Sequence, residues 1–154
     1  LHTPVLERCY ANLPLKAYED LKAFKLFLLD VGLLCCMSGI SKSVLLNGND
    51  MFKEFKGALT EQYVLQQLKA TTDFGIYYYT NDRNSCEIDF LLDDGEKVIP
   101  LEVKAEENLK AKSLKTYREK FKPALSIRAS MASYRKEEDG LVNVPLYSIS
   151  LIHT

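Results

Sequence analysis

The sequence predicts an α/β domain in which a helix, three short strands, a second helix and a further strand follow one another behind an N-terminal extension. Residues 51–70 contain no proline and mostly good helix formers, which predicts the first helix. Three segments hold β-branched or aromatic residues between polar breaks and predict strands: residues 75–79, 86–92 and 97–105. Leu114, Tyr117 and Phe121 recur at helical spacing and predict the second helix, followed by a strand near 124–130.

The composition is that of an ordinary soluble globular protein. The chain has 154 residues, of which 47% are hydrophobic and 27% charged, with a net charge of -1. This fits one domain with a conventional core and excludes disordered and collagen-like classes. The four cysteines show neither zinc-site nor disulfide spacing, and no run reaches the roughly 18 apolar residues of a membrane span. We therefore expect a cytoplasmic protein without a membrane partner.

The chain is expected to divide into an N-terminal extension, residues 1–50, packed on a core domain, residues 51–154. Within the extension, residues 24–29 are strongly apolar, and their periodicity fits a strand or a buried helix equally well. We expect this segment to pack internally rather than against another subunit. Asp30 is a plausible N-cap for a short helix over residues 31–37, although it contains a glycine.

One carboxylate lies inside the apolar stripe of the first predicted helix. Val64, Leu65 and Leu68 fall on one side of the helical wheel, and Glu61 falls between Leu65 and Leu68 in angle. A buried salt bridge and a metal-binding role for Glu61 are equally favoured interpretations.

Further charged residues are expected to meet on one face of a β-hairpin. Asp94-Gly95 between two apolar runs predicts a two-residue turn, which sets Glu87 opposite Glu102 and Asp89 opposite Pro100. Because side chains alternate along a strand, one face should hold the charged residues and the other the apolar ones. The predicted charged face carries Glu87, Asp89, Leu91, Glu102 and Lys104, and the other face carries Cys86, Ile88, Phe90 and Leu92.

Carboxylates that face one another repel unless a positive charge intervenes, and Mg²⁺ or Mn²⁺ could supply that charge through oxygen ligands. We predict that Asp89 and Glu102 bind the metal and that Glu61 adds a ligand. Lys104 could orient the attacking water or stabilise charge on a phosphoryl group, so the candidate catalytic residues are Asp89, Glu102 and Lys104. The competing interpretation is a solvated sheet face, because Asp, Glu and Lys are common in this chain.

Other chemistries find less support in the sequence. It has no GxxxxGK[ST] loop, and therefore no predicted nucleotide site, and it has no GxSxG or HExxH motif. A basic stretch at residues 108–122 could contact nucleic acid, but a solvated helix face is the favoured interpretation. The three consecutive tyrosines at residues 77–79 are expected in the core rather than stacked on bases.

The order of elements, with Asp89 and then Glu102-Val103-Lys104 on adjacent strands, resembles the PD-(D/E)xK superfamily. Residues 25–34, KLFLLDVGLL, are similar to a Lys-(apolar)-Asp-x-Gly-Leu signature of a C-terminal domain of unknown function in prokaryotic AAA-family ATPases. Cys86 departs from that family, in which a polar or glycine residue is expected. Further residues agree with it: Gly57, Glu61, Tyr77, Tyr78, Glu87, Ile88, Asp89, Phe90, Glu102, Val103, Lys104 and Tyr117.

The resemblance implies a restriction-endonuclease-like core and an N-terminal ATPase module in the same polypeptide. Two functions are open. The leading one is a Mg²⁺-dependent nuclease-like site acting on nucleic acid, with DNA as the candidate partner. The alternative is a non-catalytic domain of the ATPase that binds nucleic acid or protein, or regulates the ATPase. The superfamily includes members that have lost catalysis, so function must be argued from the site.

Overall fold

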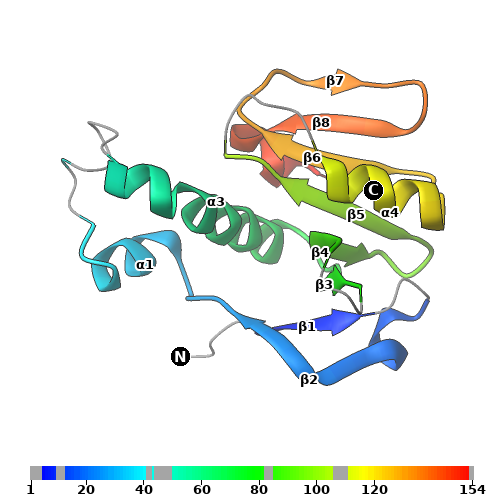
Figure 1. Cartoon of the computed structure of the whole chain (residues 1–154), viewed down its shortest axis with the longest axis horizontal. Coiled ribbons are helices and arrows are strands. Elements are labelled where there is room, and N and C mark those ends of the chain that lie inside the picture. Colours follow the sequence, from blue (N-terminus) through cyan, green and yellow to red (C-terminus); the bar gives the residue numbers. More distant parts are fainter. Residues whose placement is uncertain are drawn as a thin grey trace.

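The computed structural model describes residues 5–9, 13–40, 43, 50–81, 85–105 and 111–152, and of residues 5–7 and 50–54 the backbone alone. Within these residues the chain forms an eight-stranded mixed sheet in the order β2-β1-β3-β4-β5-β6-β8-β7 (Figure 1). The strands β3, β4 and β5 form an antiparallel meander, whereas β5, β6 and β8 are parallel.

The elements follow the predicted order. The helices are α1 (Val31–Met37), α3 (Asp50–Thr71) and α4 (Lys112–Phe121), with 3-10 turns η1 (Leu15–Tyr18) and η2 (Leu146–Leu151). The first four strands are β1 (Val5–Cys9), β2 (Glu19–Leu26), β3 (Gly75–Thr80) and β4 (Glu87–Asp93). The last four are β5 (Val98–Val103), β6 (Ser126–Ser130), β7 (Arg135–Lys136) and β8 (Leu141–Pro145). An α/β fold with both predicted helices and the meander between them is therefore confirmed.

The two long helices cover opposite faces of the sheet. On one face Val64, Leu65 and Leu68 of α3 pack on strand residues such as Leu101. On the other face Leu114 and Tyr117 of α4 pack on residues such as Ile88 and Leu91. Tyr79, Tyr117 and Phe121 add edge-on and tilted ring contacts to this second cluster, with centroids 4.6 to 5.6 Å apart. Tyr78 and Tyr79 are buried, as predicted.

The N-terminal residues extend the sheet rather than covering it. β2 is antiparallel to β1, and β1 runs parallel to β3 through the pair Arg8 and Tyr78. The apolar segment 24–29 thus begins as a strand. Internal packing is confirmed for Phe27, which is 9% exposed, and is wrong for Phe24, Leu26 and Leu29, which are 54%, 64% and 50% exposed. The predicted division of the chain at residue 50 stays a prediction.

The N-cap prediction for α1 is confirmed. The carboxylate of Asp30 accepts a hydrogen bond from the backbone N–H of Leu33 at 2.8 Å, which satisfies a donor that the helix itself leaves free. Two glutamines of α3 hold the chain on either side of this cap. Gln62 bonds the backbone N–H and carbonyl of Leu28, and Gln66 accepts from the N–H of Val31. These contacts attach the segment after β2 to α3.

The predicted two-residue turn between β4 and β5 is wrong. Asp93 pairs with Val98 and Leu91 with Pro100, so the register differs by two residues from the prediction and the loop spans residues 94–97. The reason is local hydrogen bonding: the Asp94 carboxylate accepts from the N–H groups of Glu96 and Lys97 and stabilises a longer turn. Because the difference is an even number of residues, no side chain changes face.

The predicted alternation of side chains along β4 is also wrong, because the strand contains a β-bulge. Tyr77 pairs with Leu91 and Tyr79 with Ile88, so both Asp89 and Phe90 lie opposite Tyr78. The extra residue shifts the alternation of side chains by one position after the bulge. Ile88 and Leu91 pack in the α4 cluster, whereas Phe90 and Leu92 pack in the α3 cluster.

Gly140 offers a test of the turn before β8. Its φ is +83°, and a Cβ there would lie 2.5 Å from the carbonyl oxygen of Ala124. We expect Gly140→Ala to destabilise the protein by about 2 kcal/mol, measured by urea unfolding. The matched control is Gly57→Ala in α3, where a Cβ meets nothing within 4 Å. That change should stabilise the helix by about 0.5–1 kcal/mol, and a stable Gly140→Ala protein would contradict this account of the turn.

Candidate active site

Glu61 lies in α3 beside buried Val64 and Leu65, as the wheel predicted. Its side chain is 31% exposed, and its Oε2 is 3.9 Å from Nζ of Lys25. Burial, followed by the negative charge of Asp89, raises the pKa of Glu61 to about 7, against the opposing effect of Lys25. The carboxylate is therefore held in an environment that disfavours its charge.

Asp89 lies at the β-bulge of β4. Its Oδ2 accepts a hydrogen bond of 2.7 Å from the backbone N–H of Val103, at the end of β5. Burial raises the pKa of Asp89, while that hydrogen bond and the charges of Lys25 and Lys104 act in the opposite direction. Asp89 thus connects the ends of β4 and β5 and lies within electrostatic reach of two lysines.

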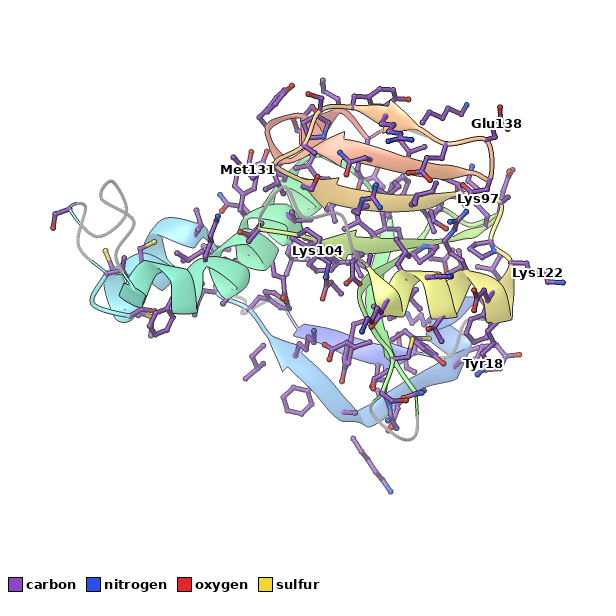
Figure 2. All side chains as sticks on the ribbon, turned by 45° about the horizontal axis from the view of Figure 1, so that its top comes forward. Tyr18, Lys97, Lys104, Lys122, Met131 and Glu138 are labelled. Carbon is purple, nitrogen blue, oxygen red and sulfur yellow. The ribbon has the colours of Figure 1, made fainter. Side chains whose placement is uncertain are left out.

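Glu102 and Lys104 lie at the end of β5, with Lys104 directly after the strand (Figure 2). The backbone N–H of Lys104 donates to the carbonyl of Ala129 on β6, which fixes the chain there. Its ammonium donates to Oε1 of Glu102 at 2.7 Å. The Glu102 side chain is only 7% exposed, and burial, then the charge of Asp89, raises its pKa to about 7.

The second oxygen of Glu102 is the unusual atom of this site. Among the described residues, Oε2 is buried without a hydrogen-bond partner. A buried carboxylate oxygen normally has one, and leaving it without a partner costs free energy. A ligand that supplies positive charge or a hydrogen bond at this oxygen would remove the cost.

Two further charged residues complete the cluster: Glu87, which was predicted on the charged face but given no role, and Lys25, which was not predicted to lie near the site. Lys25 on β2 forms an ion pair with Oε1 of Glu87 on β4, and its Nζ lies 5.2 Å from the centre of the Tyr78 ring. Burial alone would lower the pKa of Lys25, but the bond to Glu87 and the charge of Glu61 outweigh it and raise that pKa. Both residues lie in segments that resemble the family, which was the available signal.

The predicted site residues therefore come from three elements, α3, β4 and β5, and influence one another electrostatically. They are not arranged as a finished metal centre. Among the residues that the structure describes, no group of three or more His, Cys, Asp and Glu side chains could hold a metal ion as it stands. The predicted roles of Asp89, Glu102, Lys104 and Glu61 stay predictions.

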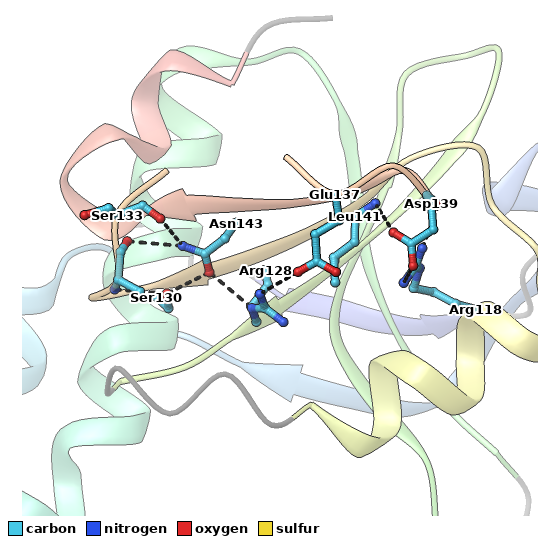
Figure 3. Close-up of polar contacts among 9 residues, drawn as sticks. Arg118, Arg128, Ser130, Ser133, Glu137, Asp139, Leu141 and Asn143 are labelled. Atoms are coloured by element: carbon cyan, nitrogen blue, oxygen red, sulfur yellow. Dashed lines mark hydrogen bonds and ion pairs between the residues drawn. The ribbon is translucent and has the colours of Figure 1, made fainter. Parts of the chain in front are cut away.

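A buried polar network connects β6, the strand next to β5, with β8. Asn143 on β8 accepts from Arg128 Nε at 3.1 Å and from Ser130 Oγ at 2.8 Å, and donates to the carbonyls of Ala132 and Ser133 (Figure 3). Arg128 is the register partner of Glu102 on β6 and also contacts Glu137 at 3.6 Å. The network stabilises β6 and β8 beside the strand that carries Glu102.

The predicted basic stretch lies partly outside the described residues, which exclude 106–110. In α4, Arg118 is bound to the carboxylate and the carbonyl of Asp139, so it ties the helix to the turn before β8 (Figure 3). The exposed lysines of this stretch are Lys112, Lys115, Lys120 and Lys122. In the view of Figure 2, Lys104 and Lys122 lie toward opposite ends of α4. Lys122, just after the C-terminal end of α4, thus lies away from Lys104.

Fold and site together define an α/β domain with a cluster of carboxylates and lysines at the ends of two central strands. The chain belongs to the family described as Domain of unknown function (DUF4143), which matches residues 56–149. That match includes Glu61, Asp89, Glu102 and Lys104 but not Lys25. No curated protein and no solved structure matches the chain. No helix within the described residues has the length and apolar character needed to span a membrane.

Proposed function

We propose that this domain has a restriction-endonuclease-like core of the PD-(D/E)xK type. Its divalent-metal site would hydrolyse phosphodiester bonds in nucleic acid. We further propose that the domain is the C-terminal part of a cytoplasmic AAA-family ATPase. The observation that carries the nuclease proposal is the buried Oε2 of Glu102, which has no hydrogen-bond partner among the described residues and lies in a cluster with Asp89, Glu61 and Lys104. The resemblance of the sequence to that ATPase family supports the wider proposal.

The donor set fits Mg²⁺ or Mn²⁺. Carboxylate oxygens are the ligands these ions prefer, and Mg²⁺ usually takes only one or two carboxylates, with waters and phosphate oxygens in the other positions. A complete set of protein ligands is therefore unnecessary. Asp89 and Glu102 would hold the ion, and Glu61, which is more exposed than Glu102, would supply a further ligand or accept a hydrogen bond from a bound water.

A bound divalent ion would lower the pKa of a coordinated water and offset negative charge on the phosphate. Lys104 has the remaining role. Its ammonium has three donors, and its hydrogen bond to Glu102 uses one. The other donors can orient the attacking water or stabilise the charge that develops on the phosphoryl oxygens. The backbone bond from Lys104 to Ala129 keeps the residue in place for this task.

A non-catalytic binding or regulatory domain is the second candidate, and a specific observation favours it. Lys104 pairs with Glu102 and Lys25 pairs with Glu87, so the cluster already contains two internal ion pairs. In that case the charges form a structural network, and the net charge of -1 gives no general attraction to nucleic acid.

Thermal melting with Mn²⁺ separates the two candidates. At 100 times its dissociation constant, a bound ion should stabilise the wild-type protein by about 2.7 kcal/mol. Asp89→Asn should lose this stabilisation, because the amide keeps an acceptor for the Val103 N–H but removes the charge that binds the ion. The control Glu96→Gln alters an exposed carboxylate of the β4–β5 loop and should respond like the wild type. Equal melting of the wild type with and without Mn²⁺ favours the binding domain.

A further inference from the structure

Lys25 joins the carboxylate cluster from a distant part of the chain. It lies on β2, and its partners are Glu61 on α3 and Glu87 on β4. Its Nζ also lies over the ring of Tyr78 on β3, at 5.2 Å from the ring centre. The Lys25 ammonium therefore connects β2, β3, β4 and α3, and it reaches the cluster from the edge strand β2.

The two lysines of the site occupy different parts of it. Lys104 contacts Glu102, and Lys25 contacts Glu61 and Glu87. Asp89 is influenced by both ammonium groups. The side chain of Lys25 is 25% exposed, so it is mostly shielded from solvent but still reaches water. A partly buried cation in this position acts on the carboxylates more strongly than a surface lysine would.

We propose that Lys25 is an internal counter-ion of this site, which holds Glu61 and Glu87 together in the metal-free protein and competes with a divalent cation for Glu61, the carboxylate that both would contact. The inference rests on the proposed function and adds to it the regulation of metal affinity. Lys25 is a positioning residue, because it acts through Glu61 and Glu87. Its position on β2 makes metal affinity depend on how that edge strand is docked.

The sign of one measurement separates competition from simple support. If Lys25 only positioned the ligands, its loss would weaken Mn²⁺ binding, whereas loss of a competing positive charge should tighten it. We expect Lys25→Met to lower the Mn²⁺ dissociation constant about fivefold or more in calorimetry, since the Coulomb repulsion between ammonium and metal is removed. Lys25→Arg, which keeps the charge, and Lys22→Met, an exposed lysine of the same strand, should stay within about twofold of the wild type.

The metal-free protein gives a second readout. Lys25→Met should melt at a lower temperature than Lys22→Met in EDTA, and Mn²⁺ should restore its melting temperature or its folding, because the ion replaces the missing charge. Unchanged or weaker Mn²⁺ binding by Lys25→Met, or a variant that Mn²⁺ cannot restore, would overturn the inference. If neither the wild type nor Lys25→Met binds Mn²⁺, both the proposed metal site and the role of Lys25 are wrong. Binding by the wild type with no gain in Lys25→Met overturns the role of Lys25 alone.

Discussion

Asp89→Asn and Lys104→Ala should each lower Mn²⁺-dependent cleavage of DNA by about 100-fold or more, if the domain is a nuclease. The magnitude follows from the loss of a group that acts on developing charge in a desolvated site. Asp89→Asn removes a charge that we propose binds the metal but keeps an acceptor for the Val103 N–H, so the strand ends should stay joined. Lys104→Ala removes the ammonium that we propose orients the attacking water, and it also removes the ion pair of Glu102 with Lys104.

Two exposed residues provide matched controls for this experiment. Glu96→Gln removes a carboxylate from the β4–β5 loop, and Lys112→Ala removes a lysine from the first turn of α4. Both proteins should cleave at the wild-type rate, measured on supercoiled plasmid and on a single-stranded oligonucleotide. Cleavage that persists in the Asp89→Asn, Lys104→Ala double variant would come from another site or from a contaminant, and would end the proposal.

The metal-free protein should become less stable as the pH rises from about 5 to 8. Glu61 and Glu102 each have a pKa raised from 4.5 to about 7, so the folded state binds their protons more tightly than the unfolded state. A raised carboxyl pKa gives stability that is present below the unfolded value and is lost as the pH rises through the folded value. Each group alone should remove roughly 2 kcal/mol across this interval, and the two together several kcal/mol.

Glu61→Gln tests the origin of this pH dependence. The amide cannot ionise, so the variant should gain stability over the wild type at pH 8 and gain little at pH 5, measured by urea unfolding in EDTA. Mn²⁺ should have the complementary effect and stabilise the wild type more at pH 8, because the carboxylates must be ionised to bind it. A Glu61→Gln protein with the same slope of stability against pH as the wild type would show that neither burial nor the charge of Asp89 raises the pKa of Glu61 substantially.

The helices and strands could largely be predicted because their signals are local. The apolar spacing in α3 located Glu61 beside Val64 and Leu65, and the cap at Asp30 followed from its residue type. The geometry of the β4–β5 turn was harder to predict from the sequence. The register of β4 and β5 depends on side-chain bonds of Asp94 to its own loop, which the Asp-Gly pair alone does not reveal.

The site itself could be predicted only in part, because its arrangement depends on contacts between segments that are distant in the sequence. The bulge at Asp89 and Phe90 arises from pairing with β3 and cannot be read from the alternation of β4. Lys25 belongs to the cluster only because β2 and β1 join the sheet beside β3. An apolar run whose strand or helix character was undecided gave no basis for that placement.

The most direct measurement is the anomalous scattering of Mn²⁺ in crystals of the wild-type protein, recorded above the manganese absorption edge. The proposed metal site predicts a peak within bonding distance of carboxylate oxygens of both Asp89 and Glu102, with Oε2 of Glu102 as one ligand. The same peak should be missing in Asp89→Asn crystals. A protein that crystallises in saturating Mn²⁺ with no peak at these two residues would contradict the metal site and leave the charged cluster as a structural network.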